Sequence, residues 1–169
     1  MNILNVREYI ETFLKIRTKD GTLMPLRLNQ PQDRMYQAVK SQWDAGKPVR
    51  IIVLKARQMG FSTLTEAIIF AITATRFYTD CMIVAHKDEA TANLFRMSLR
   101  YYENLPEPMK PMRKASNAHE LVFDKPAHYK GRRPGLGSSI KCATAGGSGV
   151  GRSATLRCLH LSEFAFWPG

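Results

Sequence analysis

The chain has 169 residues, a formal net charge of +11 and 44% hydrophobic residues. Its length is typical of one domain of roughly 100–200 residues, and its composition is that of a folded globular protein. The longest uncharged apolar stretch, residues 67–75, is too short for a membrane helix, which needs about 20 residues. The first residues also lack the basic-then-apolar pattern of a secretion signal. The sequence therefore argues against a membrane-spanning or secreted protein.

The charge indicates the kind of partner to expect. Lys and Arg total 25 against 14 Asp and Glu, and the isoelectric point is near 9.9. Such an excess favours polyanions such as nucleic acid, nucleotide or an anionic surface. On composition alone, a merely basic surface explains this excess of positive charge equally well.

The three cysteines, Cys81, Cys142 and Cys158, form no CxxC pair and show no metal-ligand spacing with the histidines, so we expect buried thiols rather than a zinc site.

Two amphipathic helices are predicted in residues 1–48. Apolar side chains recur at helical spacing over residues 6–14, with Asn5 placed as the cap of this helix. A second helix is predicted to begin at Pro31 and to end at Gly46. We expect these helices to precede a separate core formed by residues 49–169.

That core alternates strands and helices. Residues 49–55 (VRIIVLK) form a dense apolar run, typical of a strand that is buried on both faces of a parallel sheet. Helices are predicted at residues 62–77 and 88–102. Further strands are predicted at residues 81–85, 120–123, 139–143 and 156–161. The pattern predicts an α/β fold with a mostly parallel sheet flanked by helices, in which the strand at 49–55 is central.

The segment between the strand predicted at 49–55 and the helix predicted at 62–77 has the features of a phosphate-binding loop. Its residues are Lys55, Ala56, Arg57, Gln58, Met59, Gly60, Phe61, Ser62 and Thr63. In the standard pattern G-x-x-x-x-G-K-[ST], Gly60 and Ser62 fit the second glycine and the hydroxyl. Lys55 stands in place of the first glycine, and Phe61 in place of the lysine. The strict pattern therefore fails at two positions.

The physical features of such a loop nevertheless remain. A helix N-terminus offers free N–H groups and a favourable dipole to phosphate, and Gly60 permits close approach of the backbone. The Ser62 hydroxyl can ligate Mg²⁺, and either Lys55 or Arg57 can supply the missing cation. The loop predicts a nucleotide site, with an ordinary strand–helix turn as the alternative. A second glycine-rich segment, residues 146–153, precedes a strand rather than a helix, so we expect a flexible loop there.

The altered loop ARQMGFST resembles that of phage large terminases, the ATPases that package viral DNA. In that family the lysine can stand at the start of the loop, and an arginine inside it acts on the nucleotide of its own subunit; Arg57 matches this position. Upstream, LNQPQDRMY resembles the glutamine-bearing segment that recognises adenine. A glutamine amide can both donate to and accept from adenine. Gln32 is better placed than Gln30, although both also fit solvated turn residues.

Downstream, LRCLHLSEFAFWP resembles the acidic strand end of the same family. The resemblance implies that Glu163 orients or deprotonates the attacking water. The family's aspartate is replaced here by Ser162, so Ser162 or a water must support Mg²⁺. The resemblance also places Arg152 where it can contact nucleotide or a neighbouring subunit. We interpret His160 as a packed core histidine, and His86 as a structural or surface residue rather than a catalytic one.

The resemblance implies a P-loop ATPase of the additional-strand type, truncated after the acidic strand. The implied cofactors are ATP and Mg²⁺. The complete protein is expected to couple ATP hydrolysis to translocation of double-stranded DNA into a procapsid, as a homo-oligomeric ring on the portal protein. A small terminase subunit, a C-terminal nuclease domain, and a location in the host cytoplasm with no membrane partner complete the expectation.

Two other functions compete with this one. A helicase-type ATPase is expected to keep a lysine after Gly60 and an Asp-Glu pair at the acidic strand, so Phe61 and Ser162 count against it. A non-enzymatic basic DNA-binding module explains the charge but not the order of the motifs.

Overall fold

The computed structural model describes residues 3–56, 58–117, 119–146 and 155–167. Arg57, Arg152 and most of the glycine-rich segment at 146–153 lie outside the described residues. Within the described part of the chain, no helix is long and apolar enough to cross a membrane.

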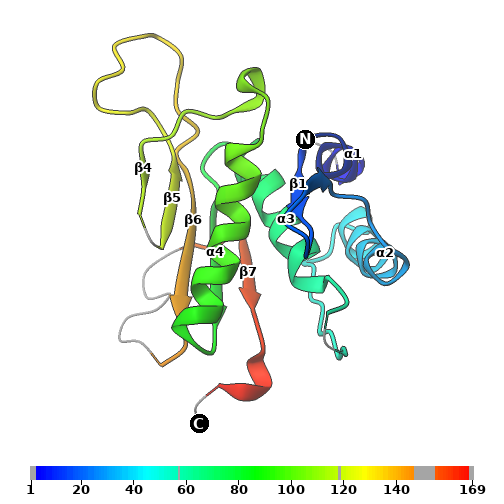
Figure 1. Ribbon diagram of the computed structural model, residues 1–169. Helices are drawn as coiled ribbons and strands as arrows, with labels where there is room; N and C mark the ends of the chain where they lie inside the picture. Colours follow the sequence, from blue (N-terminus) through cyan, green and yellow to red (C-terminus); the bar gives the residue numbers. More distant parts are fainter. Residues whose placement is uncertain (1–2, 57, 118, 147–154, 168–169) are drawn as a thin grey trace.

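The N-terminal part consists of two helices and a hairpin (Figure 1). Helix α1 (Ile3–Phe13) leads into strands β1 (Lys15–Arg17) and β2 (Leu23–Pro25), which pair antiparallel, and α2 (Gln30–Asp44) follows. Both predicted helices are confirmed, but the hairpin was not predicted, because its strands are only three residues long. Asn5 as a helix cap was wrong, since α1 begins two residues earlier.

A five-stranded mixed sheet forms the other half of the molecule. Its spatial order is β4-β5-β6-β3-β7. The strands are β3 (Asp80–Ala85), β4 (Ala115–Ser116), β5 (Glu120–Phe123), β6 (Ser138–Thr144) and β7 (Cys158–Leu161). β3 pairs parallel with both β6 and β7, whereas β4, β5 and β6 pair antiparallel. The sheet is therefore mixed rather than mostly parallel, because the loop at residues 124–137 brings β6 back antiparallel to β5.

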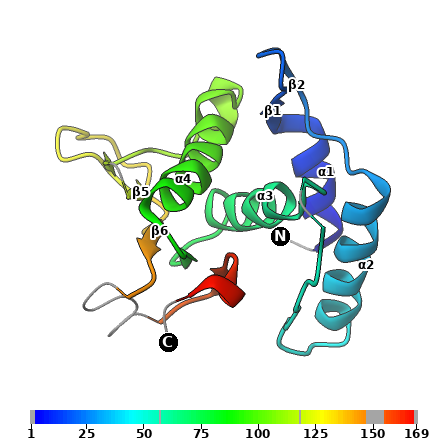
Figure 2. The same cartoon turned by 60° about the horizontal axis from the view of Figure 1, so that its bottom comes forward.

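Helices α3 (Phe61–Thr73) and α4 (Asp88–Glu103) pack against this sheet (Figures 1 and 2). α3 also contacts α1 and α2, so it is covered on several sides, and its side chains from Glu66 to Thr73 are all buried. The ring of Phe70 contacts Tyr101 of α4 at 5.7 Å and Phe123 of β5 at 5.9 Å between centroids. The core therefore lies around α3, between the sheet and the N-terminal helices.

The predicted central strand at residues 49–55 was wrong. The structure leaves this segment outside the sheet, and the side chains of Ile52 and Leu54 are fully exposed, at 101% and 102%. Its described hydrogen bonds join the Arg50 backbone to the Gln42 side chain of α2. An apolar run forms a strand only where a neighbouring strand satisfies its backbone groups. Among the described residues, none does so here.

Candidate nucleotide-binding site

The N-terminus of α3 is open to an anion. Gly60 precedes the helix with φ +76° and ψ 12°, and no side chain caps it. The first N–H groups of a helix have no partner within it, and the helix dipole there attracts negative charge. The Ser62 side chain makes no hydrogen bond to the described residues, so its hydroxyl is available beside those N–H groups. This geometry can hold a phosphate group.

The start of α2 fixes the shape of this loop. Gln32 donates from Nε2 to the Gly60 carbonyl at 2.7 Å, while its Oε1 accepts from the Asn29 backbone at 3.0 Å. Asn29 in turn caps α2 and donates to the Met59 carbonyl at 3.4 Å. A Cβ on Gly60 would lie 2.6 Å from Gln32 Nε2. Glycine is therefore required at position 60 both by its positive φ and by this close approach.

The direction of α3 relative to the sheet follows from two side-chain contacts. Thr73, at the end of α3, lies 3.2 Å from the sulfur of Cys81, near the start of β3. Glu66, about two turns earlier in the helix, lies 2.7 Å from Nδ1 of His160, near the end of β7. Because β3 and β7 are parallel, α3 therefore runs in the direction opposite to both strands.

This orientation brings the glycine loop and Glu163 to the same end of the sheet. Gly60 lies about 9 Å before Glu66 along the helix axis, and Glu163 lies two residues after the last residue of β7. Both extend towards the carboxyl end of the parallel strands, the end where open α/β sheets bind ligands. The expectation that they share one site is consistent with this arrangement.

Glu163 is held in a strained position and faces a histidine. It has φ +54° and ψ 42°, a left-handed conformation that is uncommon outside glycine and clusters at functional sites. Its Oε2 lies 2.9 Å from Nδ1 of His86, although the alignment is not that of a hydrogen bond. The His86 ring also lies 6.0 Å from the ring of Phe166, in the short 3₁₀ helix η2 (Phe164–Phe166).

Strand register explains why His86 meets Glu163. Val84 of β3 pairs with Leu161 of β7. His86 lies two residues after Val84, and Glu163 lies two residues after Leu161. The backbone of Ser162 continues the ladder by donating to Val84. Sequence reasoning gave His86 no chemical role, because the sequence alone does not show that these two strands are neighbours.

A buried carboxyl group contacts a second histidine and connects α3 to β7. Glu66 is completely buried, and its carboxylate contacts His160 and, at 3.5 Å, the hydroxyl of Ser98 in α4. Burial raises the pKa of Glu66, and its contacts with His160 and Ser98 offset this only in part. His160 is therefore packed as expected, but against a carboxyl group that ties the helix after the loop to the strand before Glu163.

The remaining loop residues differ in their surroundings. Lys55 and Ala56 are exposed, and the Lys55 side chain makes no hydrogen bond or salt bridge to the described residues. Gln58 has φ +63° and accepts from Lys19 at 3.3 Å. The Thr63 carbonyl accepts from the Tyr101 hydroxyl at 3.1 Å, which fixes the first turn of α3 to α4. Arg57 and Arg152 lie outside the described residues.

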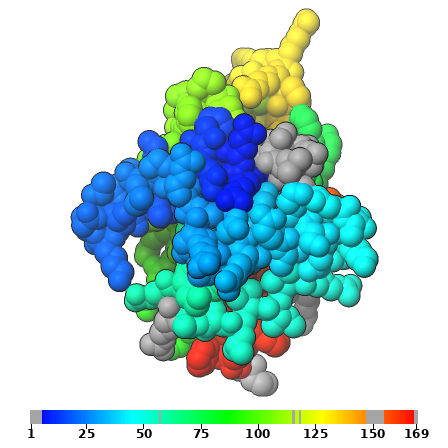
Figure 3. Space-filling view, turned by 90° about the vertical axis from the view of Figure 1, so that its right-hand side faces the viewer, coloured from blue at the N-terminus to red at the C-terminus, as the bar shows by residue number. Residues whose placement is uncertain are grey.

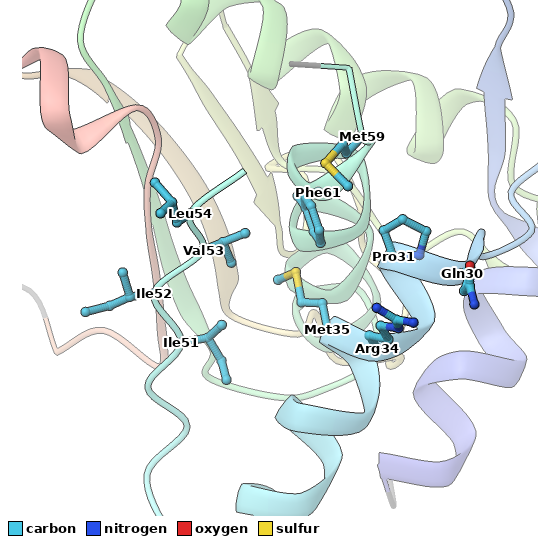
Figure 4. A pocket seen from close by; sticks show the side chains of 10 residues that line it. All are labelled: Gln30, Pro31, Arg34, Met35, Ile51, Ile52, Val53, Leu54, Met59 and Phe61. Carbon is cyan, nitrogen blue, oxygen red and sulfur yellow. The ribbon is translucent and has the colours of Figure 1, made fainter. Parts of the chain in front are cut away.

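An open pocket adjoins the loop (Figure 4). Its volume is about 370 Å³, and it lies between the first turns of α2, the segment at 51–54 and the loop. Its lining includes Gln30, Arg34, Met35 and Phe61. Gln30 therefore lies at the pocket. Gln32 is buried instead, and its amide oxygen and nitrogen both make hydrogen bonds inside the protein.

The donor set for Mg²⁺ is small. The described residues contain no group of three or more His, Cys, Asp or Glu that could hold a metal ion by themselves. Mg²⁺ usually keeps several waters and binds through one or two protein oxygens together with substrate phosphates. The available Ser62 hydroxyl fits that mode. Ser162 is 8% exposed, so its hydroxyl is less accessible.

One solved structure has the same arrangement of elements. The crystal structure of the HK97 bacteriophage large terminase superposes with a TM-score of 0.65, over 86% of this chain and with 18% sequence identity. This chain has the fold of part of a phage large terminase. The mixed sheet with flanking helices is thus a terminase-type arrangement.

The likeness is one of fold and not of sequence. The sequence matches no family model and no curated protein. This chain also spans only 28% of the HK97 terminase chain. The likeness therefore shows the fold alone, and the chemistry of the site rests on this chain's own residues.

Proposed function

We propose that this chain is the ATP-binding part of a DNA-packaging motor, in which ATP hydrolysis drives double-stranded DNA into a procapsid. The observation that carries the proposal is the common location of the uncapped α3 N-terminus and Glu163 at one end of the sheet. The opposite directions of α3 and β7 support that location. The terminase-like fold supports the biological setting.

In this proposal the triphosphate lies against the first turn of α3. The free N–H groups bind phosphate oxygens, and Gly60 lets the backbone approach them. Lys55 reaches the β- and γ-phosphates, since Phe61 cannot supply a charge-assisted hydrogen bond. Arg57 then stabilises the charge that develops in the transition state. Ser62, with Ser162 as a weaker candidate, would help to hold Mg²⁺, which neutralises phosphate charge when bound.

Glu163 activates the attacking water in the same proposal. A carboxylate just beyond the end of a parallel strand can accept a proton from water or orient it for in-line attack. The His86 contact holds the Glu163 side chain over the end of β3. His86 is thus a positioning residue that keeps the carboxylate from turning away into solvent.

The adenine base is assigned to the pocket beside the loop. Its walls are mostly apolar, and Arg34 and Phe61 offer surfaces for a flat ring. Gln30 is the glutamine that we propose reads the base, because the Gln32 amide already bonds Asn29 and Gly60. Gln32 instead connects the base-binding segment to the phosphate loop.

The assembly is proposed on the basis of resemblance alone. From the resemblance of its motifs to those of phage large terminases, we propose a homo-oligomeric ring on a portal protein, with a small terminase subunit as partner and a nuclease domain elsewhere in the complete motor. The host cytoplasm is the proposed location. Arg152 is proposed to contact nucleotide or the neighbouring subunit in that ring.

The test of the catalytic assignment is Glu163→Gln in the full-length motor. Glutamine keeps the size of the side chain but cannot accept a proton, so ATP turnover should be lost while nucleotide affinity changes little. Steady-state hydrolysis and equilibrium binding of a non-hydrolysable ATP analogue measure the two quantities. Glu103→Gln removes an exposed carboxylate at the end of α4 and serves as the matched control. Near-normal turnover in Glu163→Gln would remove Glu163 from the catalytic role.

Lys55 and Arg57 are separated by comparing affinity with rate. A charge-assisted hydrogen bond contributes roughly 1.5–3 kcal/mol, so Lys55→Ala should weaken ATP binding about ten- to a hundredfold. Arg57→Ala should chiefly slow hydrolysis. Lys47→Ala removes an exposed lysine from the turn after α2 and should change neither quantity. Unchanged affinity in Lys55→Ala, with a large loss of affinity in Arg57→Ala, would mean that the two roles are reversed.

A further inference from the structure

A long loop between β5 and β6 forms the most prominent projection of the molecule. Residues 125–135 leave the sheet after Asp124 and return just before β6 (Figure 1). The ends of the loop are joined, because Leu136 donates to the Phe123 carbonyl at 3.1 Å and accepts from the Tyr78 backbone at 2.9 Å. Surface loops of this kind, with their ends held close together, are frequently functional.

Glycines fix the path of this loop. A Cβ on Gly135 would collide with Asp124 and with the backbone of Lys125 at the base of the loop. A Cβ on Gly131 would lie 2.5 Å from the ring of Tyr129, so that ring packs directly on the backbone near the tip. The loop is thus a shaped feature held at its base.

The loop concentrates positive charge. Its basic residues are Lys125, Lys130, Arg132 and Arg133, and it contains no Asp or Glu. Lys130, Arg132 and Arg133 are exposed, and none of them takes part in a salt bridge within the described part of the chain. Charges left without carboxylate partners are available for an external anion.

This charge lies far from the candidate nucleotide site. The loop leads into β6 at Ser138, whose hydroxyl donates to the Arg76 carbonyl at 2.7 Å, so it stands at the starting end of the parallel strands. Glu163 stands at their opposite, carboxyl end. Figure 3 shows the loop projecting at one extreme of the molecule and the segment after β7 at the other. Neutralising the loop should therefore leave nucleotide binding intact.

We propose that the loop at 125–135 is a contact for the phosphate backbone of double-stranded DNA. The inference rests on the proposed function, because duplex DNA is the substrate of the motor, and it adds the surface that touches this substrate. Three exposed cations without carboxylate partners on one projecting loop match the closely spaced phosphates of a duplex. Contacts of this kind position a protein on DNA without reading its sequence.

The shape and composition of the loop favour a duplex over other anions. Proteins that bind single strands combine a basic groove with several aromatic platforms. This loop projects instead of forming a groove, and Tyr129 is its one aromatic residue other than a histidine. A membrane-binding loop would be expected to carry several large apolar side chains, and this loop has no Leu, Ile, Val, Met, Phe or Trp.

The test compares two triple variants that remove the same charge. The loop variant is Lys130→Ala with Arg132→Ala and Arg133→Ala. The control variant is Lys15→Ala with Arg27→Ala and Lys47→Ala, three exposed residues of the N-terminal half. Fluorescence anisotropy of a labelled mixed-sequence duplex is measured over a range of salt concentrations. Binding of a non-hydrolysable ATP analogue and the midpoint of thermal unfolding are measured on the same samples.

The loop variant should bind duplex DNA at least tenfold more weakly than the wild type at low salt. The dependence of log affinity on log salt should become shallower by about 0.9 for each phosphate that the variant no longer neutralises. The control variant should keep most of the affinity, and all three proteins should bind the ATP analogue and unfold alike. Because the residues are exposed, misfolding is not expected to mimic the result.

Four outcomes would overturn the assignment. Wild-type protein that does not bind duplex, a loop variant that binds as tightly as the wild type, or equal losses of affinity in the two variants would each show that the loop is not the contact. Equal losses would mean that net charge alone determines binding. Stronger binding of the wild type to a single strand than to the duplex would also contradict it. None of these results would affect the nucleotide site, whose own test is binding of the ATP analogue.

Discussion

Two apolar runs that were both predicted as strands take different positions in this protein. Residues 49–55 (VRIIVLK) and the strand β3 (Asp80–Ala85, DCMIVA) are both mainly apolar, and both were predicted as buried strands of the sheet. β3 lies inside the sheet with β6 on one side and β7 on the other, and Ile83 is 0% exposed. The run at 49–55 stays outside the sheet, with Ile52 fully exposed.

The difference shows that neighbours decide whether an apolar run becomes a strand. Each residue of β3 pairs on at least one edge, and α3 and α4 pack against the strand. The segment at 49–55 is followed instead by a loop whose position is set by Asn29 and Gln32 of α2. β3 therefore belongs to the hydrogen-bonded sheet, whereas this segment connects α2 to the phosphate loop.

The largest expected effect is on stability, and it compares Ile83 of β3 with Ile52 of the segment at 49–55. Ile83→Ala should lower the free energy of unfolding by about 2–5 kcal/mol, because it opens a cavity in the core. Ile52→Ala should change it by no more than about 0.5 kcal/mol, since an exposed side chain loses little packing. Urea denaturation of both variants measures the two values. A loss in Ile52→Ala as large as that in Ile83→Ala would mean that residues 49–55 are buried in the sheet after all.

The next largest effect on stability is expected at Gly60, whose carbonyl accepts a hydrogen bond from the Gln32 side chain of α2. Gly60→Ala places a side chain in left-handed backbone and displaces the buried Gln32 amide from the Gly60 carbonyl. We expect a loss of roughly 2–3 kcal/mol, the sum of backbone strain and a broken hydrogen bond. Gly46→Ala is the control, because Gly46 also has a positive φ of +66° but has nothing within 4 Å of the added Cβ.

Thermal or urea unfolding of both glycine variants separates strain from contact. Gly46→Ala should show the strain alone, about 1–2 kcal/mol. If the two variants are equally destabilised, Gln32 does not hold the loop. The segment at 49–55 would then be attached to the rest of the site less firmly than its contacts indicate.

The smallest effect is a pH dependence within the sheet region. Because the pKa of Glu66 is raised in the folded protein, folding favours its protonated form. The associated stability is fully present below the ordinary carboxyl pKa and is lost as the pH rises through the raised value. Glu66→Gln should therefore flatten the decline of stability towards neutral pH, whereas Glu8→Gln, at an exposed position of α1, should not. Unfolding midpoints over a pH series measure this, and parallel curves for wild type and Glu66→Gln would contradict the assignment.

Much of the fold was predictable from local patterns. α2, α4, β3 and β5 have clear periodicity or β-branched composition, and the structure confirms each of them close to its predicted ends. The mixed character of the sheet was not predictable, because the return of β5 alongside β6 depends on contacts that are distant in sequence. β4 escaped prediction because two residues carry no periodic signal.

The candidate site was predictable only in part. Gly60 and Ser62 stand at a helix start and Glu163 at a strand end, as their motifs indicated. The contacts that organise the site were not visible in the sequence. No motif singled out Glu66, and His86 was interpreted as a structural or surface residue. Both acquire partners only when α3, β3 and β7 come together.

The central claim is that the α3 N-terminus and Glu163 form a single nucleotide site, and hydrogen–deuterium exchange tests it most directly. A non-hydrolysable ATP analogue with Mg²⁺ should slow exchange of the backbone amides in the first turn of α3 and in the residues around Glu163. The DNA-contact loop at 125–135 should exchange as before. Protection at both places would support the account. Protection at neither place, or at the start of α3 without the residues around Glu163, would contradict it.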